Sequence, residues 1–174
     1  MSIERLYARI VEDTHIWNSP IHGTEHWIRV RDNALYLAKH NNGDPKVVEY
    51  FAILHDSQRW NEHIDPEHGP RAADYAKTQR SLIDLSDEQF TLLQRACAGH
   101  THAKPETTRS PDPTLACCWD ADRLDIGRVG IKQRRSRRGL IQISQRLGER
   151  RSHKMSFVSY ERIGTLKPIS RKST

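Results

Sequence analysis

Apolar residues recur every three or four positions along most of the first 125 residues, which is the spacing of amphipathic helices. Residues 3–13 show it clearly, with apolar side chains at Ile3, Leu6, Ile10 and Val11. No run of alternating apolar and polar residues is long enough to predict a strand. The pattern therefore predicts an all-α protein, a bundle of about six or seven helices.

Capping residues and prolines predict where the other helices begin. Thr24 is a predicted N-cap, and Asp44-Pro45 and Asp112-Pro113 each place a capping aspartate before a proline at the first helical position. Ser86 with Gln89 three residues later is typical of a capping box. The predicted helices cover residues 3–13, 24–41, 45 to about 55, 67–80, 87–101 and a sixth from 113 to about 126.

Charge divides the 174-residue chain into two parts. The net charge is +6, but residues 1–130 carry 15 Lys+Arg against 20 Asp+Glu, whereas residues 131–174 carry 13 against 2. The first part is therefore at −5 and the second at +11. We predict a helical domain over residues 1–130 and a basic C-terminal extension over 131–174, with one further helix and a mobile tail.

Three cysteines and the hydropathy of the chain bear on its location. Cys97, Cys117 and Cys118 form no metal-binding CxxC and leave an odd count, which favours reduced thiols. No apolar run approaches the roughly 20 residues of a membrane span, and the N-terminus lacks a signal peptide's apolar core. These features predict a cytoplasmic protein with no membrane partner.

Histidine and aspartate residues stand at the ends or on the inward faces of the predicted helices. His55-Asp56 follows directly on the apolar run from Phe51 to Leu54, and buried imidazoles and carboxylates need a partner or a metal. Helix bundles build metal sites from such side chains on facing helices. The candidates, in chain order, are His26, His55, Asp56, His68, His100 and Asp122. His22, by contrast, precedes its helix; it could reach the mouth of the pocket, but is interpreted as a loop or capping residue.

The order of these residues resembles the HD-domain superfamily of metal-dependent phosphohydrolases. The signature of that superfamily is a histidine, a His-Asp pair and a distant aspartate, all on helices. The segments that carry the resemblance are HGTEHWIRV, FAILHDSQR, DPEHGPRAA, CAGHTH and CWDADRLDIGRVG, within about residues 18–130. The resemblance implies an HD-domain-like bundle.

The resemblance also implies roles for individual residues. It implies four metal ligands, which are His26, His55, Asp56 and Asp122. Among the aspartates of DADRLD it selects Asp122 rather than Asp120 or Asp125. His68 and His100 match positions that hold a second metal ion or bind phosphate.

Two arginines are the best candidates for stabilising charge on a phosphoryl group. Arg59 lies one turn after Asp56, and Arg123 is next to Asp122. The alternative for each arginine is a salt bridge with the acidic body. Asp56 could orient the attacking water in addition to binding metal. The ligand set admits one or two divalent ions and does not select among Mn, Fe, Co, Ni, Zn and Mg.

Three functions remain open at this stage. The first is a metal-dependent phosphohydrolase that hydrolyses a phosphoester of a small phosphorylated compound, with a nucleotide as the favoured substrate. The second is a metal-dependent nuclease that holds nucleic acid through residues 132–174. The third is a non-catalytic binding or regulatory module, against which the complete ligand set argues. The oligomeric state and the metal are left open.

Overall fold

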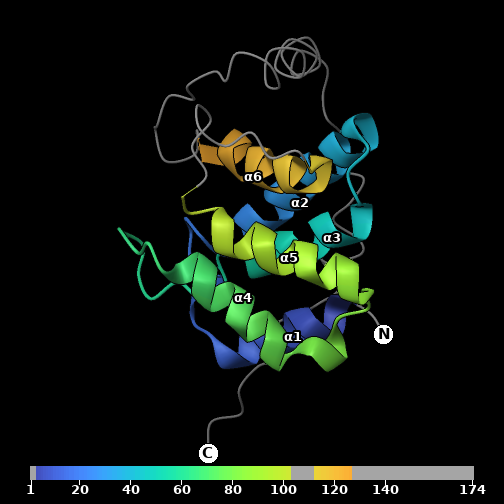
Figure 1. Ribbon diagram of the computed structural model, residues 1–174. Helices are drawn as coiled ribbons and strands as arrows, with labels where there is room; N and C mark the ends of the chain where they lie inside the picture. The colour runs from blue at the N-terminus through green and yellow to red at the C-terminus, as the bar shows by residue number, and fades with distance from the viewer. Residues whose placement is uncertain (1–2, 103–111, 127–174) are drawn as a thin grey trace, which may run out of the picture. The chain divides into compact units, whose positions relative to one another are not determined.

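The computed structural model describes residues 3–102 and 112–126. All regular structure in these two ranges is helical, as the sequence predicted (Figure 1). The elements, in chain order, are α1 (Ile3–Asp13), η1 (Ile16–Asn18), α2 (Thr24–Asn41), α3 (Pro45–Leu54), α4 (His68–Thr78), η2 (Arg80–Leu82), α5 (Asp87–Gly99) and α6 (Pro113–Asp125), where η marks a 3-10 helix.

Helix α3 lies at the centre of the bundle. The helices α2, α4, α5 and α6 all pack against it, and α2 also packs against α6, and α4 against α5. Val47, Phe51 and Leu54 of α3 have no exposed surface, and burying each such side chain contributes roughly 1.5–3 kcal/mol. Because every residue from Tyr50 to Leu54 is buried, α3 ends inside the protein and delivers the residues that follow it to the interior.

The predicted helix starts at the two Asp-Pro pairs and at Ser86 are confirmed. The Asp44 side chain accepts hydrogen bonds from the amides of Lys46 and Val47, and Asp112 caps α6 in the same way. Ser86 and Gln89 form a capping box at α5. These contacts satisfy backbone amides that have no partner within their helices. They fix the N-terminal ends of α3, α5 and α6.

The prediction that Thr24 is the N-cap of α2 is wrong. Gly23 occupies the cap position, and the Thr24 hydroxyl donates to the carbonyl oxygen of Trp17 at 3.0 Å. A Cβ atom at residue 23 would lie 2.4 Å from the carbonyl oxygen of Ser19. The turn before α2 therefore approaches Gly23 too closely for any side chain, and glycine is also tolerated as an N-cap.

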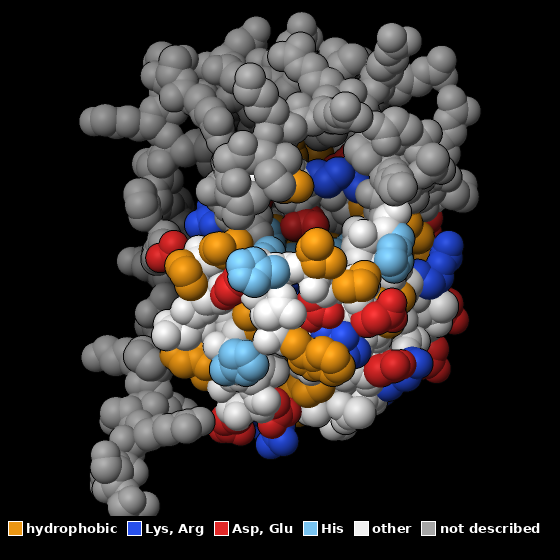
Figure 2. All heavy atoms as spheres, turned by 90° about the vertical axis from the view of Figure 1, so that its left-hand side faces the viewer, with side chains coloured by type: hydrophobic (Ala, Val, Ile, Leu, Met, Phe, Trp, Pro, Cys, Tyr) orange, Lys and Arg blue, Asp and Glu red, His pale blue; other side chains and the backbone are white. Residues whose placement is uncertain are grey.

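The loop between α3 and α4 lies on the left of Figure 1, the side that faces the viewer in Figure 2. Histidine, acidic and basic side chains gather there among apolar ones (Figure 2). The large apolar side chains most exposed among the described residues, Trp60 (72%) and Ile64 (91%), belong to this loop. The Arg71 guanidinium of α4 stacks 3.9 Å from the centre of the Trp60 ring.

The structure bears on the predictions about the cysteines and the membrane span, but not on those about the C-terminal extension. All three cysteines are buried and none is in a disulfide. No helix in the described ranges has the length and apolarity needed to cross a membrane. The predicted boundary at residue 130, the predicted seventh helix and the basic extension all lie outside the described residues.

Candidate metal centre

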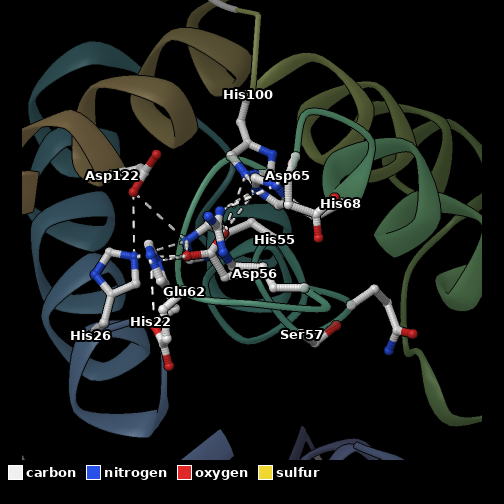
Figure 3. A network of polar contacts seen from close by, with 12 residues as sticks. His22, His26, His55, Asp56, Ser57, Glu62, Asp65, His68, His100 and Asp122 are labelled. Atoms are coloured by element: carbon white, nitrogen blue, oxygen red, sulfur yellow. Dashed lines mark hydrogen bonds and ion pairs between the residues drawn. The ribbon is translucent and has the colours of Figure 1, made fainter. Parts of the chain in front are cut away.

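Five helices bring the candidate residues into one buried cluster (Figure 3). The cluster forms because α3 ends in the interior, so that its last turn meets the first turn of α4 and the last turn of α5. On the other side α2 and α6 each contribute one inward residue. The contributors are His26 from α2, His55 and Asp56 after α3, His68 from α4, His100 after α5 and Asp122 from α6.

The first half of the cluster is built around the facing imidazoles of His26 and His55. Their Nε2 atoms lie 3.1 Å apart, and neither side chain is exposed. Asp56 Oδ2 lies 3.5 Å from His26 Nε2 and 3.7 Å from His55 Nε2. Asp122 Oδ1 lies 3.3 Å and 3.7 Å from the same two atoms. Two nitrogens and two carboxylate oxygens thus converge on one point.

Hydrogen bonds at the far side of each ring set its orientation. His26 Nδ1 donates to Asp125 Oδ2 at 2.7 Å, and Arg29 Nε donates to the other oxygen of Asp125 at 2.8 Å. His55 Nδ1 donates to the carbonyl oxygen of Ala52 at 3.0 Å. Since these partners are acceptors, each neutral ring carries its proton on Nδ1 and presents the lone pair of Nε2 to the centre.

The second half of the cluster repeats this arrangement with His68 and His100. Their Nε2 atoms face each other at 2.8 Å. His100 Nδ1 donates to the carbonyl oxygen of Cys97 at 2.7 Å, and His68 Nδ1 donates to the carbonyl oxygen of Asp65. Again two Nε2 lone pairs converge, and in this pair a backbone carbonyl oxygen orients each ring.

Gly69 allows the second pair of histidines to meet. A Cβ atom at this position would lie 2.5 Å from the carbonyl oxygen of Cys97 and 3.1 Å from His100 Nδ1. The first turn of α4 therefore touches the last turn of α5 at a distance that only glycine permits.

Asp56 joins the two halves. Its Oδ2 faces the His26–His55 pair, while Oδ1 lies 2.9 Å from His68 Nε2 and 3.6 Å from His100 Nε2. Burial alone would raise the pKa of Asp56, but the imidazoles around it hold that pKa well below its usual range. Two groups of buried side chains could each hold a metal ion, His26 with His55 and Asp56, and Asp56 with His68 and His100.

The pKa values of His26 and His55 are shifted in opposite directions. Burial lowers the pKa of His55 to about 3. Burial also opposes protonation of His26, but hydrogen bonds to Asp122, Asp125 and Asp56 outweigh it and raise the pKa of His26 to about 10. In the absence of another cation, one proton therefore lies between the two Nε2 atoms.

The donor set fits divalent metal ions. Four converging lone pairs that belong to two neutral imidazoles and two carboxylates need a positive charge at their centre. Nitrogen and oxygen donors of this kind bind Mn, Fe, Co, Ni and Zn. Each imidazole also has the outer hydrogen-bond acceptor that metal-binding histidines usually possess.

The two predicted arginines lie in different surroundings. Arg59 Nη1 lies 3.4 Å from Asp56 Oδ1 and 3.1 Å from both ring nitrogens of His68, so its guanidinium is part of the cluster. Arg123 Nη2 forms an ion pair with Asp120 at 2.6 Å, which is the alternative that the sequence left open. A phosphate-binding role for Arg123 stays a prediction.

Two residues of the cluster were not predicted as site residues. Asp125 orients His26, and the signal was its spacing of three from Asp122, which places both carboxylates on one face of α6. His22 Nδ1 donates to Asp56 Oδ2 at 2.9 Å. Its sequence signal was weak because His22 precedes α2, so helical spacing says nothing about where its ring points.

Comparison with known proteins supports the fold. No protein-family model matches the chain, and no curated protein sequence matches it. The structure is similar to the crystal structure of a predicted HD superfamily hydrolase from an uncultured Thermotogales bacterium, with a TM-score of 0.55 and 23% sequence identity. The match covers 84% of this chain and 90% of the other. The chain therefore has the HD-domain fold, as its sequence predicted.

Proposed function

We propose that this protein is a metal-dependent phosphohydrolase that hydrolyses a phosphoester of a small phosphorylated compound. The observation that carries the proposal is the position of Asp56, whose two oxygens each face a pair of histidines. Carboxylates and imidazoles arranged in this way hold divalent ions for hydrolysis at phosphorus. The similarity to a predicted HD superfamily hydrolase agrees with this chemistry.

The protein residues would hold the ions as follows. His26, His55, Asp56 and Asp122 would hold one ion, and Asp56, His68 and His100 a second. Bound there, a divalent ion would polarise a phosphoryl oxygen and lower the pKa of a coordinated water towards neutrality.

The surroundings of the cluster suggest where a phosphate would bind. The side chain of Asp122 is 27% exposed, whereas those of His26 and His55 are fully buried. Substrate would therefore approach on the side of Asp122. The Arg59 guanidinium, whose side chain is 9% exposed, lies between Asp56 and His68 and would stabilise charge on the phosphoryl oxygens. We propose a nucleotide as the substrate, which is also the substrate that the sequence analysis favoured.

The test is a screen of nucleotides and other phosphomonoesters with each of Mn, Fe, Co, Ni, Zn and Mg, with released phosphate as the readout. We expect turnover with at least one metal, and a loss of at least 100-fold in His55→Ala and Asp122→Ala. His40→Ala is the matched control, since His40 is exposed on α2. Tight metal binding without turnover of any substrate would instead identify a binding module.

A further inference from the structure

His22 lies between two carboxylates at the edge of the cluster. Its backbone amide donates to Ser19 Oγ at 2.8 Å, so the turn before α2 holds the residue in place. Its Nδ1 donates to Asp56 Oδ2 at 2.9 Å, and its Nε2 lies 3.9 Å from Glu62 Oε2 (Figure 3). The ring thus connects the α3–α4 loop to the carboxylate that both histidine pairs share.

Asp56 needs a fixed orientation to serve both pairs. If the Asp56 carboxylate rotated about χ2, its two oxygens would no longer face one histidine pair each. The χ2 angle of aspartate has a broad distribution, so the rotamer preference of the side chain does not fix it. The hydrogen bond from His22 holds Oδ2 on the side of His26 and His55, and so leaves Oδ1 directed at His68 and His100.

We infer that His22 is a positioning residue for Asp56, and that it sets the affinity of the cluster for both metal ions. The inference rests on the metal binding of the proposed function. His22 is not among the residues grouped as metal ligands, because its Nδ1 donates to Asp56 and its Nε2 lies toward Glu62. Hydrogen-bond partners of metal ligands typically contribute 10- to 100-fold to metal affinity.

Glu62 supports the same orientation from the α3–α4 loop. Its Oε2 is buried and has no hydrogen-bond partner within the described ranges, and it faces the far nitrogen of the His22 ring. When the imidazole is protonated on both nitrogens, a buried carboxylate oxygen in this position attracts its Nε2–H edge and limits rotation of the ring. Removing the charge in Glu62→Gln should therefore weaken metal binding less than removing His22, by a few-fold.

The experiment is a calorimetric titration of metal-free full-length protein with Mn²⁺ and Zn²⁺. His22→Ala removes the hydrogen bond to Asp56. His22→Asn keeps a donor close to the position of Nδ1, because the asparagine amide nitrogen stands the same number of bonds from the backbone. His63→Ala is the matched control, since it removes an exposed histidine from the same loop as Glu62.

We expect 10- to 100-fold weaker binding of both ions in His22→Ala, recovery to within a few-fold in His22→Asn, and no change in His63→Ala. The thermal unfolding midpoint of the metal-free variants separates positioning from a general loss of stability. Equal metal affinity in His22→Ala and wild type, or equal loss in the alanine and asparagine variants, would overturn the inference. Wild-type protein that binds no metal would instead refute the proposed function.

Discussion

The Nε2 atoms of His26 and His55 face each other at 3.1 Å, although both rings have their Nδ1 atoms bonded to acceptors. Two neutral imidazoles in this arrangement would direct lone pairs at each other. The pKa of His26, raised to about 10 by its carboxylate partners, shows how the metal-free protein avoids this conflict. A proton takes the position that a metal ion would occupy.

Metal binding at this pair should therefore release a proton. The metal-free site is protonated below pH 10, whereas a metal ion needs the bare lone pair, so apparent affinity should rise up to tenfold per pH unit between pH 6.5 and 8. Calorimetry in buffers of different ionisation enthalpy measures the number of protons released. We expect at least one proton for the first ion, and affinity that does not depend on pH would contradict this assignment.

Asp125 should matter to metal binding although it is not a predicted ligand. Asp125→Asn weakens the acceptor for His26 Nδ1, and the ring loses both its fixed orientation and part of its basicity. We expect 10- to 100-fold weaker binding of the first ion in a metal titration. Asp120→Asn is the matched control on the same helix, because the described contact of Asp120 is its ion pair with Arg123.

Helix starts that depend on contacts within two or three residues were predicted correctly from the sequence, whereas one that depends on the fold of a preceding turn was not. Asp44, Ser86 and Asp112 bond to amides two or three residues away, so their helix starts could be predicted from sequence. Thr24 was misassigned because the decisive contact, between Gly23 and the Ser19 carbonyl, depends on how the preceding turn folds.

The same distinction holds at the metal centre. The resemblance to the HD-domain superfamily implied the four ligands, and the structure places them together, with both Asp122 and Asp56 within 3.7 Å of the His26 and His55 Nε2 atoms. The pairings that orient them were not predicted, since His26 meets Asp125 across 99 residues and His22 meets Asp56 across 34. Such pairings follow from helix packing, which apolar spacing does not specify.

Gly69 gives a way to impair the second pair of histidines selectively. The added methyl group in Gly69→Ala would press on the Cys97 carbonyl and the His100 ring, and should force α4 away from α5. We expect the unfolding free energy to fall by about 1–3 kcal/mol and the second equivalent of metal to be lost, while the first still binds.

The control for Gly69→Ala is Ala72→Gly, a change of one methyl group in the opposite direction on the same helix. Ala72 is fully buried, and the change should cost roughly 1 kcal/mol of stability without affecting metal stoichiometry. Loss of the second ion in both variants would show that α4 is merely sensitive to destabilisation. Retention of both ions in a destabilised Gly69→Ala would mean that binding of the second ion does not depend on the close contact between α4 and α5.

Asp65 links the stability of the α3–α4 loop to pH. Burial opposes its ionisation, but the hydrogen bonds from the Arg71 guanidinium and the Trp60 amide prevail and lower the pKa of its carboxyl. A carboxyl with a lowered pKa in the folded state stabilises that state above its unfolded value of about 4, and the contribution is lost as pH falls through the folded value. Wild-type stability should therefore decline as the pH falls below about 4.

Asp65→Asn tests this link, since it removes the charge and leaves the backbone carbonyl that accepts from His68. We expect it to lower the unfolding free energy at pH 7 by roughly 1.5–3 kcal/mol, the value of hydrogen bonds to a charged group. Denaturant unfolding at several pH values should also show a smaller acid-dependent loss than in wild type. Asp74→Asn, an exposed aspartate of α4 paired only with Lys77 among the described contacts, is the control. Parallel pH profiles for Asp65→Asn and wild type would show that Asp65 does not carry this dependence.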